Sequence, residues 1–306
     1  MDDIQDRQNS FKRNVTGVVV SLVALTCIFF GGLPLYLMVL TVILIASKEY
    51  VHILQMKGFH PSFSVMAVVG VGICSLIAIG KVDLLTVMLV AGTIASFLIV
   101  LFMGRQPYIA NVATTELGFM YGTLLPCHIL LLRQIETNIQ ENAFFYELWS
   151  CPSEGFFLTM FTFLCVFVTD VSAYFIGKRH GKHKLSAVIS PKKTIEGAIG
   201  GGILGILISM LGCLYTKLTP LECFIGGLLI TIFSQLGDLS ESLIKRDAGV
   251  KDSSNILPGH GGFLDRCDGF IFALPVAYYY FINFTHGHNV LSEYYIVVKN
   301  LINAVI

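Results

Sequence analysis

The stretch LPGHGGFLDRCDGFIFALPVAYYYFI, residues 257–282, joins a glycine-rich, charged segment to a continuous apolar one. Its second half has the composition of a membrane helix, but its first half sets Asp265 and Asp268 beside three glycines. A charged side chain at the centre of a membrane span costs roughly 2.5–3.5 kcal/mol. Two acids at the start of such a helix therefore indicate chemistry rather than packing.

The rest of the chain is also apolar. Its 306 residues are 55% hydrophobic and 13% charged, with a mean hydropathy of +0.75, whereas soluble domains carry about 25% charged residues. A helix needs about 20 apolar residues to cross a bilayer. We therefore predict an all-α fold, a polytopic membrane helix bundle with about nine transmembrane helices. The predicted spans are 14–31, 33–47, 62–80, 83–103, 109–132, 155–177, 195–215, 221–244 and 263–284.

Basic residues indicate how these spans are oriented. With the N-terminus in the cytoplasm, only Lys81, Arg133, Lys217 and Lys299 of the 20 Lys and Arg residues fall on the far side. Such a bias towards one side is typical of the cytoplasmic face. The short second span can extend through KEYVHI, and the GGLP that precedes it predicts a tight helical hairpin.

Three regions follow from this arrangement. The expected N-terminal multi-span membrane region is 1–160, the catalytic membrane region is 161–285, and the C-terminal tail is 286–306. Two cytoplasmic loops of the catalytic region, 178–194 and 245–266, hold ten of the 20 basic residues. Topology and attraction to anionic lipids can explain part of this charge, but not its mixture with acids in the second loop.

The acids of the catalytic region suit a metal ion. Asp265 and Asp268 are three residues apart and so share a helix face, while Asp170 and Asp238 interrupt two other apolar runs. A divalent cation would relieve the repulsion between such carboxylates, and Mg²⁺ prefers oxygen ligands together with substrate phosphates. The alternatives are acids favoured by a helix dipole and interior polar residues paired with a neighbouring helix.

The glycines and lysines add an anion site. Gly261 and Gly262 would let backbone N–H groups approach a phosphate at a helix N-terminus. The SPKKT segment, 190–194, and the KR pair, 245–246, bring lysine and arginine to the same loops, and both side chains bind phosphates. Together, these features predict metal-assisted phosphoryl or nucleotidyl transfer at the cytoplasmic side of the bundle.

At these residues the sequence resembles the phosphatidate cytidylyltransferases, also called CDP-diacylglycerol synthases. Residues 242–268, SLIKRDAGVKDSSNILPGHGGFLDRCD, match every fixed position of that family's signature, with Cys267 where a larger apolar residue or Thr is usual. SPKKTIEGAIGG, 190–201, resembles a second family block, with Ile195 where Trp is common. The resemblance covers about 165–285.

The resemblance implies that CTP and phosphatidic acid react to give CDP-diacylglycerol and pyrophosphate for phospholipid biosynthesis. It implies Mg²⁺ bound by Asp238, Asp265 and Asp268, with a second cation such as K⁺, and a catalytic set completed by Lys193 and Arg266. The substrate-binding residues that it implies are Ser190, Lys192, Thr194, Lys245, Arg246, Lys251, Asp252, His260, Gly261, Gly262 and Asp170. It also implies a homodimer and no nucleic-acid partner, in a bacterial inner membrane or, alternatively, an organelle membrane.

Other functions are less consistent with the sequence. A cation-coupled transporter would need charges near mid-membrane on several helices, often with inverted repeats, whereas these acids cluster with basic loops at one face. Lipid-linked phosphotransferases such as a polyprenol kinase are nearer alternatives. A CDP-alcohol phosphotransferase requires an Asp-Gly-x-x-Ala-Arg motif, and the DRCDGF of this chain is not followed by Ala-Arg.

Overall fold

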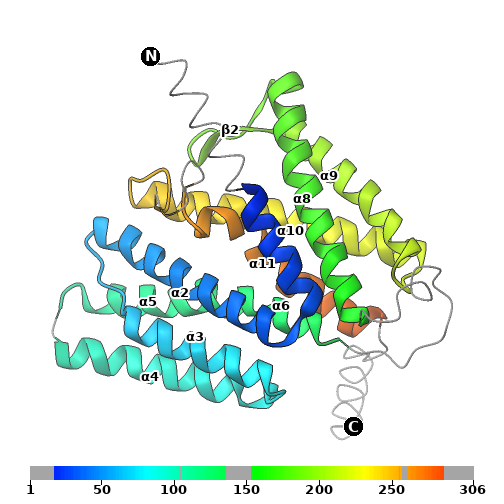
Figure 1. The fold of residues 1–306 in the computed structure, drawn as a ribbon. Coiled ribbons are helices and arrows are strands. Elements are labelled where there is room, and N and C mark those ends of the chain that lie inside the picture. Colours follow the sequence, from blue (N-terminus) through cyan, green and yellow to red (C-terminus); the bar gives the residue numbers. More distant parts are fainter. Residues whose placement is uncertain (1–16, 104, 136–152, 255, 257–260, 286–306) are drawn as a thin grey trace, which may run out of the picture.

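The protein is a helical bundle in which each predicted span corresponds to a helix (Figure 1). The computed structural model describes residues 17–103, 105–135, 153–254, 256 and 261–285. The all-α, polytopic prediction is confirmed, and six of the described helices are long and apolar enough to cross a membrane. The tail 286–306 lies outside the described residues.

Several helices continue through a turn of different pitch. The 3₁₀ turn η1 leads into α4, the π-helical turn η2 joins α5 to α6, and η3 and η4 extend α9 and α11. The helical elements are Gly17–Phe30, α2 Gly32–Met56, α3 Phe63–Ala78, η1 Val82–Leu84, α4 Leu85–Met103, α5 Tyr108–Phe119, η2 Met120–Leu124, α6 Leu125–Arg133, α8 Glu154–His180, α9 Ile195–Met210, η3 Leu211–Leu214, α10 Pro220–Asp247, α11 Leu264–Tyr280 and η4 Phe281–Thr285.

The predicted hairpin at GGLP is confirmed. Gly31 has φ = 63°, a conformation that glycine adopts without the steric cost of a Cβ, and it lets the chain reverse between Gly17–Phe30 and α2. The side chain of Arg133, at the end of α6, donates hydrogen bonds to the carbonyls of Ile28 at 3.0 Å and Phe29 at 3.3 Å. One arginine therefore satisfies carbonyls that the end of the first helix leaves without partners.

Helices α8 and α9 pack closely through glycines. Gly197, Gly201 and Gly205 recur every four residues on α9 and are buried. A Cβ on Gly201 would lie 2.6 Å from the carbonyl oxygen of Thr169 in α8. Small residues at this spacing are how membrane helices bring their backbones together, and here they hold α8, which carries Asp170, against the helix that follows SPKKT.

Helix α10 directs a polar stripe towards the inside of the bundle. A capping box begins the helix: Thr219 Oγ1 accepts from the Glu222 N–H, and Glu222 accepts from the Thr219 N–H at 2.7 Å. Asp238, Glu241 and Lys245 then recur at intervals of three and four residues, which places them on one helix face. Within that stripe Glu241 and Lys245 are buried, and α11 is the neighbour that covers them.

The N-terminal and C-terminal helices share one core. The largest buried cluster includes Tyr50 of α2, Ile73 of α3, Phe161 of α8 and Phe281 of η4. Helix α4 lies at the outer edge beside α3 and exposes most of its apolar side chains (Figure 1), as a lipid-facing helix does. Helices α8 and α11, with its extension η4, are therefore packed against the first spans.

Candidate active site

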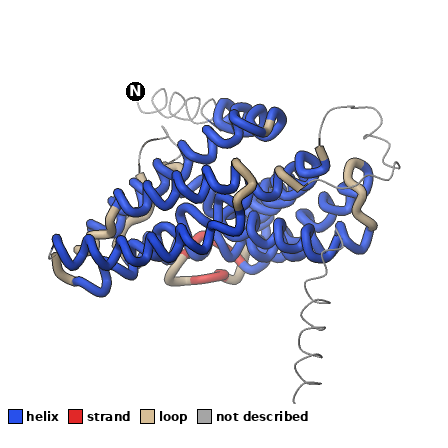
Figure 2. The backbone as a smooth tube through the Cα atoms, turned by 90° about the horizontal axis from the view of Figure 1, so that it is seen from below, coloured by secondary structure: helices blue, strands red, loops and turns tan. Residues whose placement is uncertain are grey.

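A small β-hairpin carries the SPKKT segment to the bundle. Within the loop expected at 178–194, strand β1, Lys184–Ser186, pairs antiparallel with β2, Ser190–Thr194, and Lys184 stands opposite Thr194. Figure 2 shows these two strands outside the helices. The sequence reading treated this segment as loop and missed the hairpin. Glu196, in the first turn of α9, closes its base by accepting from the backbone N–H of Lys182 at 3.0 Å and bonding His183 Nδ1 at 2.6 Å.

The hairpin sets Lys193 against α10. Lys193 Nζ forms an ion pair with Asp238 Oδ2, so a basic residue of the first loop meets an acid predicted to bind metal. Thr194 caps α9, its hydroxyl accepting from the Gly197 N–H at 3.1 Å. Ser190 is half-buried and Lys192 is exposed.

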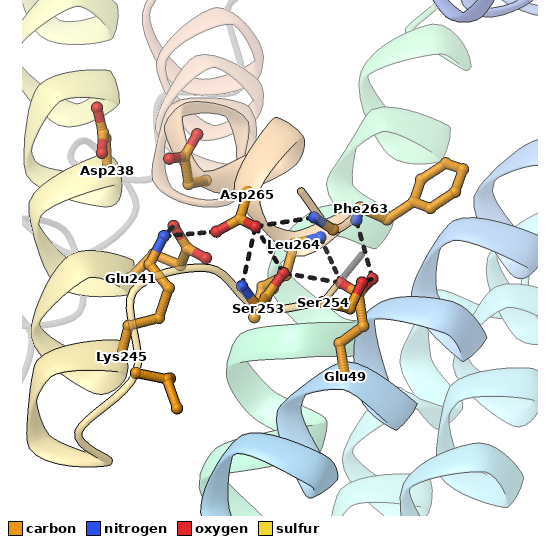
Figure 3. Close-up of polar contacts among 12 residues, drawn as sticks. Glu49, Asp238, Glu241, Lys245, Ser253, Ser254, Phe263, Leu264 and Asp265 are labelled. Atoms are coloured by element: carbon orange, nitrogen blue, oxygen red, sulfur yellow. Dashed lines mark hydrogen bonds and ion pairs between the residues drawn. The ribbon is translucent and has the colours of Figure 1, made fainter. Parts of the chain in front are cut away.

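A second lysine, Lys245, is buried between two carboxylates. Its ammonium lies 2.7 Å from Glu241 Oε2 and 2.5 Å from Asp265 Oδ1. Helix α10 therefore contributes one acid and one base, and α11 contributes the second acid (Figure 3). Desolvating these charges is costly, and the ion pairs between them offset that cost.

Asp265 is fixed by donors on both oxygens. Its Oδ2 accepts from the backbone N–H of Gly262 at 2.8 Å and that of Ser253 at 2.9 Å, and Ser253 Oγ is also within 2.9 Å. Gly261 has φ = 77°, which lets the chain turn so that the next N–H points at this carboxylate. The Gly262 N–H, which the sequence suggested could approach a phosphate, is therefore bonded to the Asp265 carboxylate in this structure.

Negative charge gathers around Asp268. Its carboxylate is repelled by those of Asp238, Glu241 and Asp170, and a methyl on the neighbouring Gly269 would lie 3.4 Å from Asp170 Oδ2. Among the described residues, Glu241 Oε1 is buried without a hydrogen-bond partner. A buried acceptor left without a donor and an excess of carboxylates both suit a bound cation.

The predicted metal ligands are neighbours but do not yet converge. Nowhere in the described ranges are three His, Cys, Asp or Glu side chains close enough to hold one ion. Asp238 is paired with Lys193, and Asp265 with Lys245. For all three predicted aspartates to bind one cation, their carboxylates must come closer together than they are here.

The remaining predicted residues lie around this centre. Arg246 ties the hairpin to α10: its Nε donates to the Ile189 carbonyl at 3.2 Å and its Nη1 to the Val250 carbonyl at 2.8 Å. Lys251 and Asp252 are exposed in the loop after α10, and Arg266 is exposed in the first turn of α11. His260 lies outside the described residues.

Sequence reasoning missed Glu49, a buried residue of α2 whose carboxylate contacts the segment before α11 (Figure 3). The available signal was an acid inside KEYVHI, the extension of the short second span. Ser253 and Ser254 were also missed, although they lie within the signature. Their hydroxyls are bonded to the carboxylates of Asp265 and Glu49.

The amino-acid sequence matches a known family over nearly the whole length of the chain. A model described as the cytidylyltransferase family matches residues 11–284. The chain belongs to the cytidylyltransferase family. This family relationship identifies it as a nucleotidyltransferase, and its apolar helices make it a multi-pass membrane protein.

Curated relatives of the family are similar over most of their length. A phosphatidate cytidylyltransferase of Synechocystis sp. is 33% identical over 283 residues, 89% of this chain and 96% of the relative. Phosphatidate cytidylyltransferases of Staphylococcus haemolyticus and Staphylococcus epidermidis are 34% and 36% identical, and each alignment covers 86% of this chain and 96% of the relative. The similarity therefore extends into the first 160 residues, where the sequence reading found no motif.

Proposed function

We propose that this protein condenses CTP with phosphatidic acid to form CDP-diacylglycerol and pyrophosphate, for phospholipid biosynthesis. The observation that carries the proposal is the ion pair between Lys193 and Asp238, because it brings the SPKKT segment to the acids of α10 and α11. The names of the curated relatives support the same substrates. Their bacterial sources favour an inner membrane, with the active site on its cytoplasmic face.

The reaction does not require a strong general base. A phosphate oxygen of phosphatidic acid attacks the α-phosphorus of CTP. As the new P–O bond forms, the bond between the α-phosphorus and the oxygen that bridges to the β-phosphorus breaks. Pyrophosphate leaves with that electron pair. The nucleophile is already anionic near neutral pH, so catalysis requires alignment and neutralisation of charge more than proton removal.

The charged residues of the site meet these demands. Lys193 and Lys245 are positioned to exchange their carboxylate partners for phosphate oxygens when substrates bind, with Arg266, Arg246 and Lys192 nearby. Asp238, Asp265 and Asp268 would hold Mg²⁺, which neutralises phosphate charge when bound. The proposal extends to a second cation such as K⁺ and to a homodimer, as the family resemblance implied.

The position of the acids follows from the two substrates. Phosphatidic acid remains in the bilayer and CTP arrives from water, so their phosphates meet at the membrane surface. Asp265 stands in the first turn of α11, where a helix emerges from a polar loop. This position explains why acids stand directly before a strongly apolar segment.

Pyrophosphate release by the detergent-purified protein tests the proposal. We expect release from CTP that requires both phosphatidic acid and Mg²⁺, with CDP-diacylglycerol as the lipid product. Each component is omitted in turn, and labelled CTP is also offered with a polyprenol acceptor. Release with the polyprenol but not with phosphatidic acid, or no release from folded protein, would overturn it.

A further inference from the structure

The carboxylate of Glu49 is held by three donors and one shared hydroxyl from a distant part of the chain. Glu49 Oε1 accepts from the Phe263 N–H at 3.1 Å and from Ser254 Oγ at 2.5 Å. Its Oε2 accepts from the Leu264 N–H at 2.8 Å, and Ser253 Oγ lies 3.2 Å away. Helix α2 thus reaches the segment that precedes α11 through one side chain (Figure 3).

These contacts replace a cap that α11 lacks. The first N–H groups of a helix have no partner within the helix, and Phe263, at the N-cap position, makes no side-chain capping bond. Glu49 supplies the missing acceptor from another helix. A negative charge at this end is also favoured by the helix dipole.

The burial of Glu49 is consistent with its role as the acceptor for the first N–H groups of α11. Its exposed fraction is 2%, and within the described ranges no basic side chain forms an ion pair with it. A buried charge without a counterion depends on hydrogen bonds for its stability. With three donors and a shared hydroxyl around its two oxygens, Glu49 has little capacity left for a ligand.

The same segment orients Asp265. Ser253 Oγ lies within hydrogen-bond distance of both Glu49 Oε2 and Asp265 Oδ2, so the two carboxylates share one hydroxyl. A Cβ on Gly262 would lie 2.6 Å from both oxygens of Glu49, so this glycine makes room for the acid. The Gly262 N–H meanwhile donates to Asp265.

We propose that Glu49 is a positioning residue, which fixes the Ser253–Ser254 segment and the first turn of α11 so that Asp265 and Asp268 face the substrates. It acts through Ser253 and the backbone at 263–264 and does not itself touch CTP or lipid. Its effect on turnover rests on the proposed function, whereas its effect on the order of this segment does not.

The test compares Glu49→Gln with wild type in detergent by amide hydrogen exchange and by turnover. Gln keeps the size of the side chain but replaces one acceptor oxygen with an NH₂ group. We expect exchange at the amides of Phe263 and Leu264 to rise about tenfold or more. We expect kcat to fall about 10- to 100-fold, the usual cost of losing a residue that orients a catalytic group, with a thermal midpoint close to that of wild type.

Lys57→Met is the matched control, because Lys57 also joins α2 to α10, through its ion pair with Asp247. It should change neither readout. If Glu49→Gln fails to fold, Ser254→Ala, which removes one donor to Oε1, should show smaller changes in the same directions. The proposal would be overturned if Glu49→Gln kept the hydrogen exchange and the kcat of wild type, or if it lost stability while kcat stayed unchanged. An inactive wild-type enzyme would instead refute the proposed reaction. The hydrogen-exchange comparison would still test whether Glu49 orders this segment.

Discussion

Lys193 of β2 forms an ion pair with Asp238 of α10, so the first charged loop of the sequence reaches the polar stripe of α10. Lys245 forms the corresponding pairs with Glu241 and Asp265. The two lysines neutralise carboxylates that would otherwise repel one another. In the proposed mechanism, substrate phosphates and a cation replace these partners, so that no charge is left unpaired.

Removing Lys193 should impair turnover more than stability. In Lys193→Ala the side chain that pairs with Asp238 is lost, and we expect kcat/KM for CTP to fall by about 10²-fold or more, as when one charge-stabilising donor is removed. The side chain of Lys182 is on the same loop and exposed, so Lys182→Ala serves as the control and should keep wild-type kinetics. Equal effects of the two substitutions would show that loop charge alone matters.

Asp265→Asn should nearly abolish turnover. Asn keeps the shape but loses the charge that pairs with Lys245 and the second acceptor oxygen, so we expect kcat to fall by about 10³-fold. Pyrophosphate release gives the rate, and gel filtration with thermal unfolding checks the fold. Asp83→Asn, in η1, is a control that should remain active. Full activity of the Asp265 variant would contradict its assignment as a metal ligand.

Lys245→Met should destabilise the protein. It leaves Glu241 and Asp265 buried or half-buried without their cation, a situation that costs about 3–5 kcal/mol. The double variant Glu241→Gln/Lys245→Met removes one of the stranded charges and should recover part of that loss. The midpoint of thermal unfolding in detergent measures both. If the double variant were less stable than the single one, charge burial would not be the cause.

Arg133→Ala should affect stability but not chemistry. It removes the donors to the Ile28 and Phe29 carbonyls, which we expect to lower stability by about 1–3 kcal/mol. Arg133→Lys should recover part of this, because an ammonium can reach one carbonyl but not copy the planar fork. Pyrophosphate release below the unfolding temperature should match wild type, and a loss of kcat there would link this end of the bundle to the site.

The helices were predictable from sequence because each span is long and apolar by itself. The GGLP turn is also a local signal, and it was predicted correctly. The division into regions at residue 160 stays a prediction, although the shared core joins the two sides of that boundary.

The hairpin and the side-chain partners were not predictable in the same way. Strand β1 has only three residues, too few for an alternating pattern to be distinguished from loop. Asp265 was identified by its spacing from Asp268, but its partner Lys245 is 20 residues away on another helix. Glu49 is separated from Leu264 by 215 residues, and only tertiary packing brings them together.

That separation sets an order for the synthesis of the protein. Ribosomes make α2 well before α11, because Glu49 and Leu264 are 215 residues apart. The carboxylate of Glu49 therefore enters the membrane before the groups that bind it have been made. The nascent chain can therefore complete this corner of the site only after its last described helix has been inserted. A chain truncated before α11 would carry an unmatched buried acid, a defect that quality-control proteases could recognise.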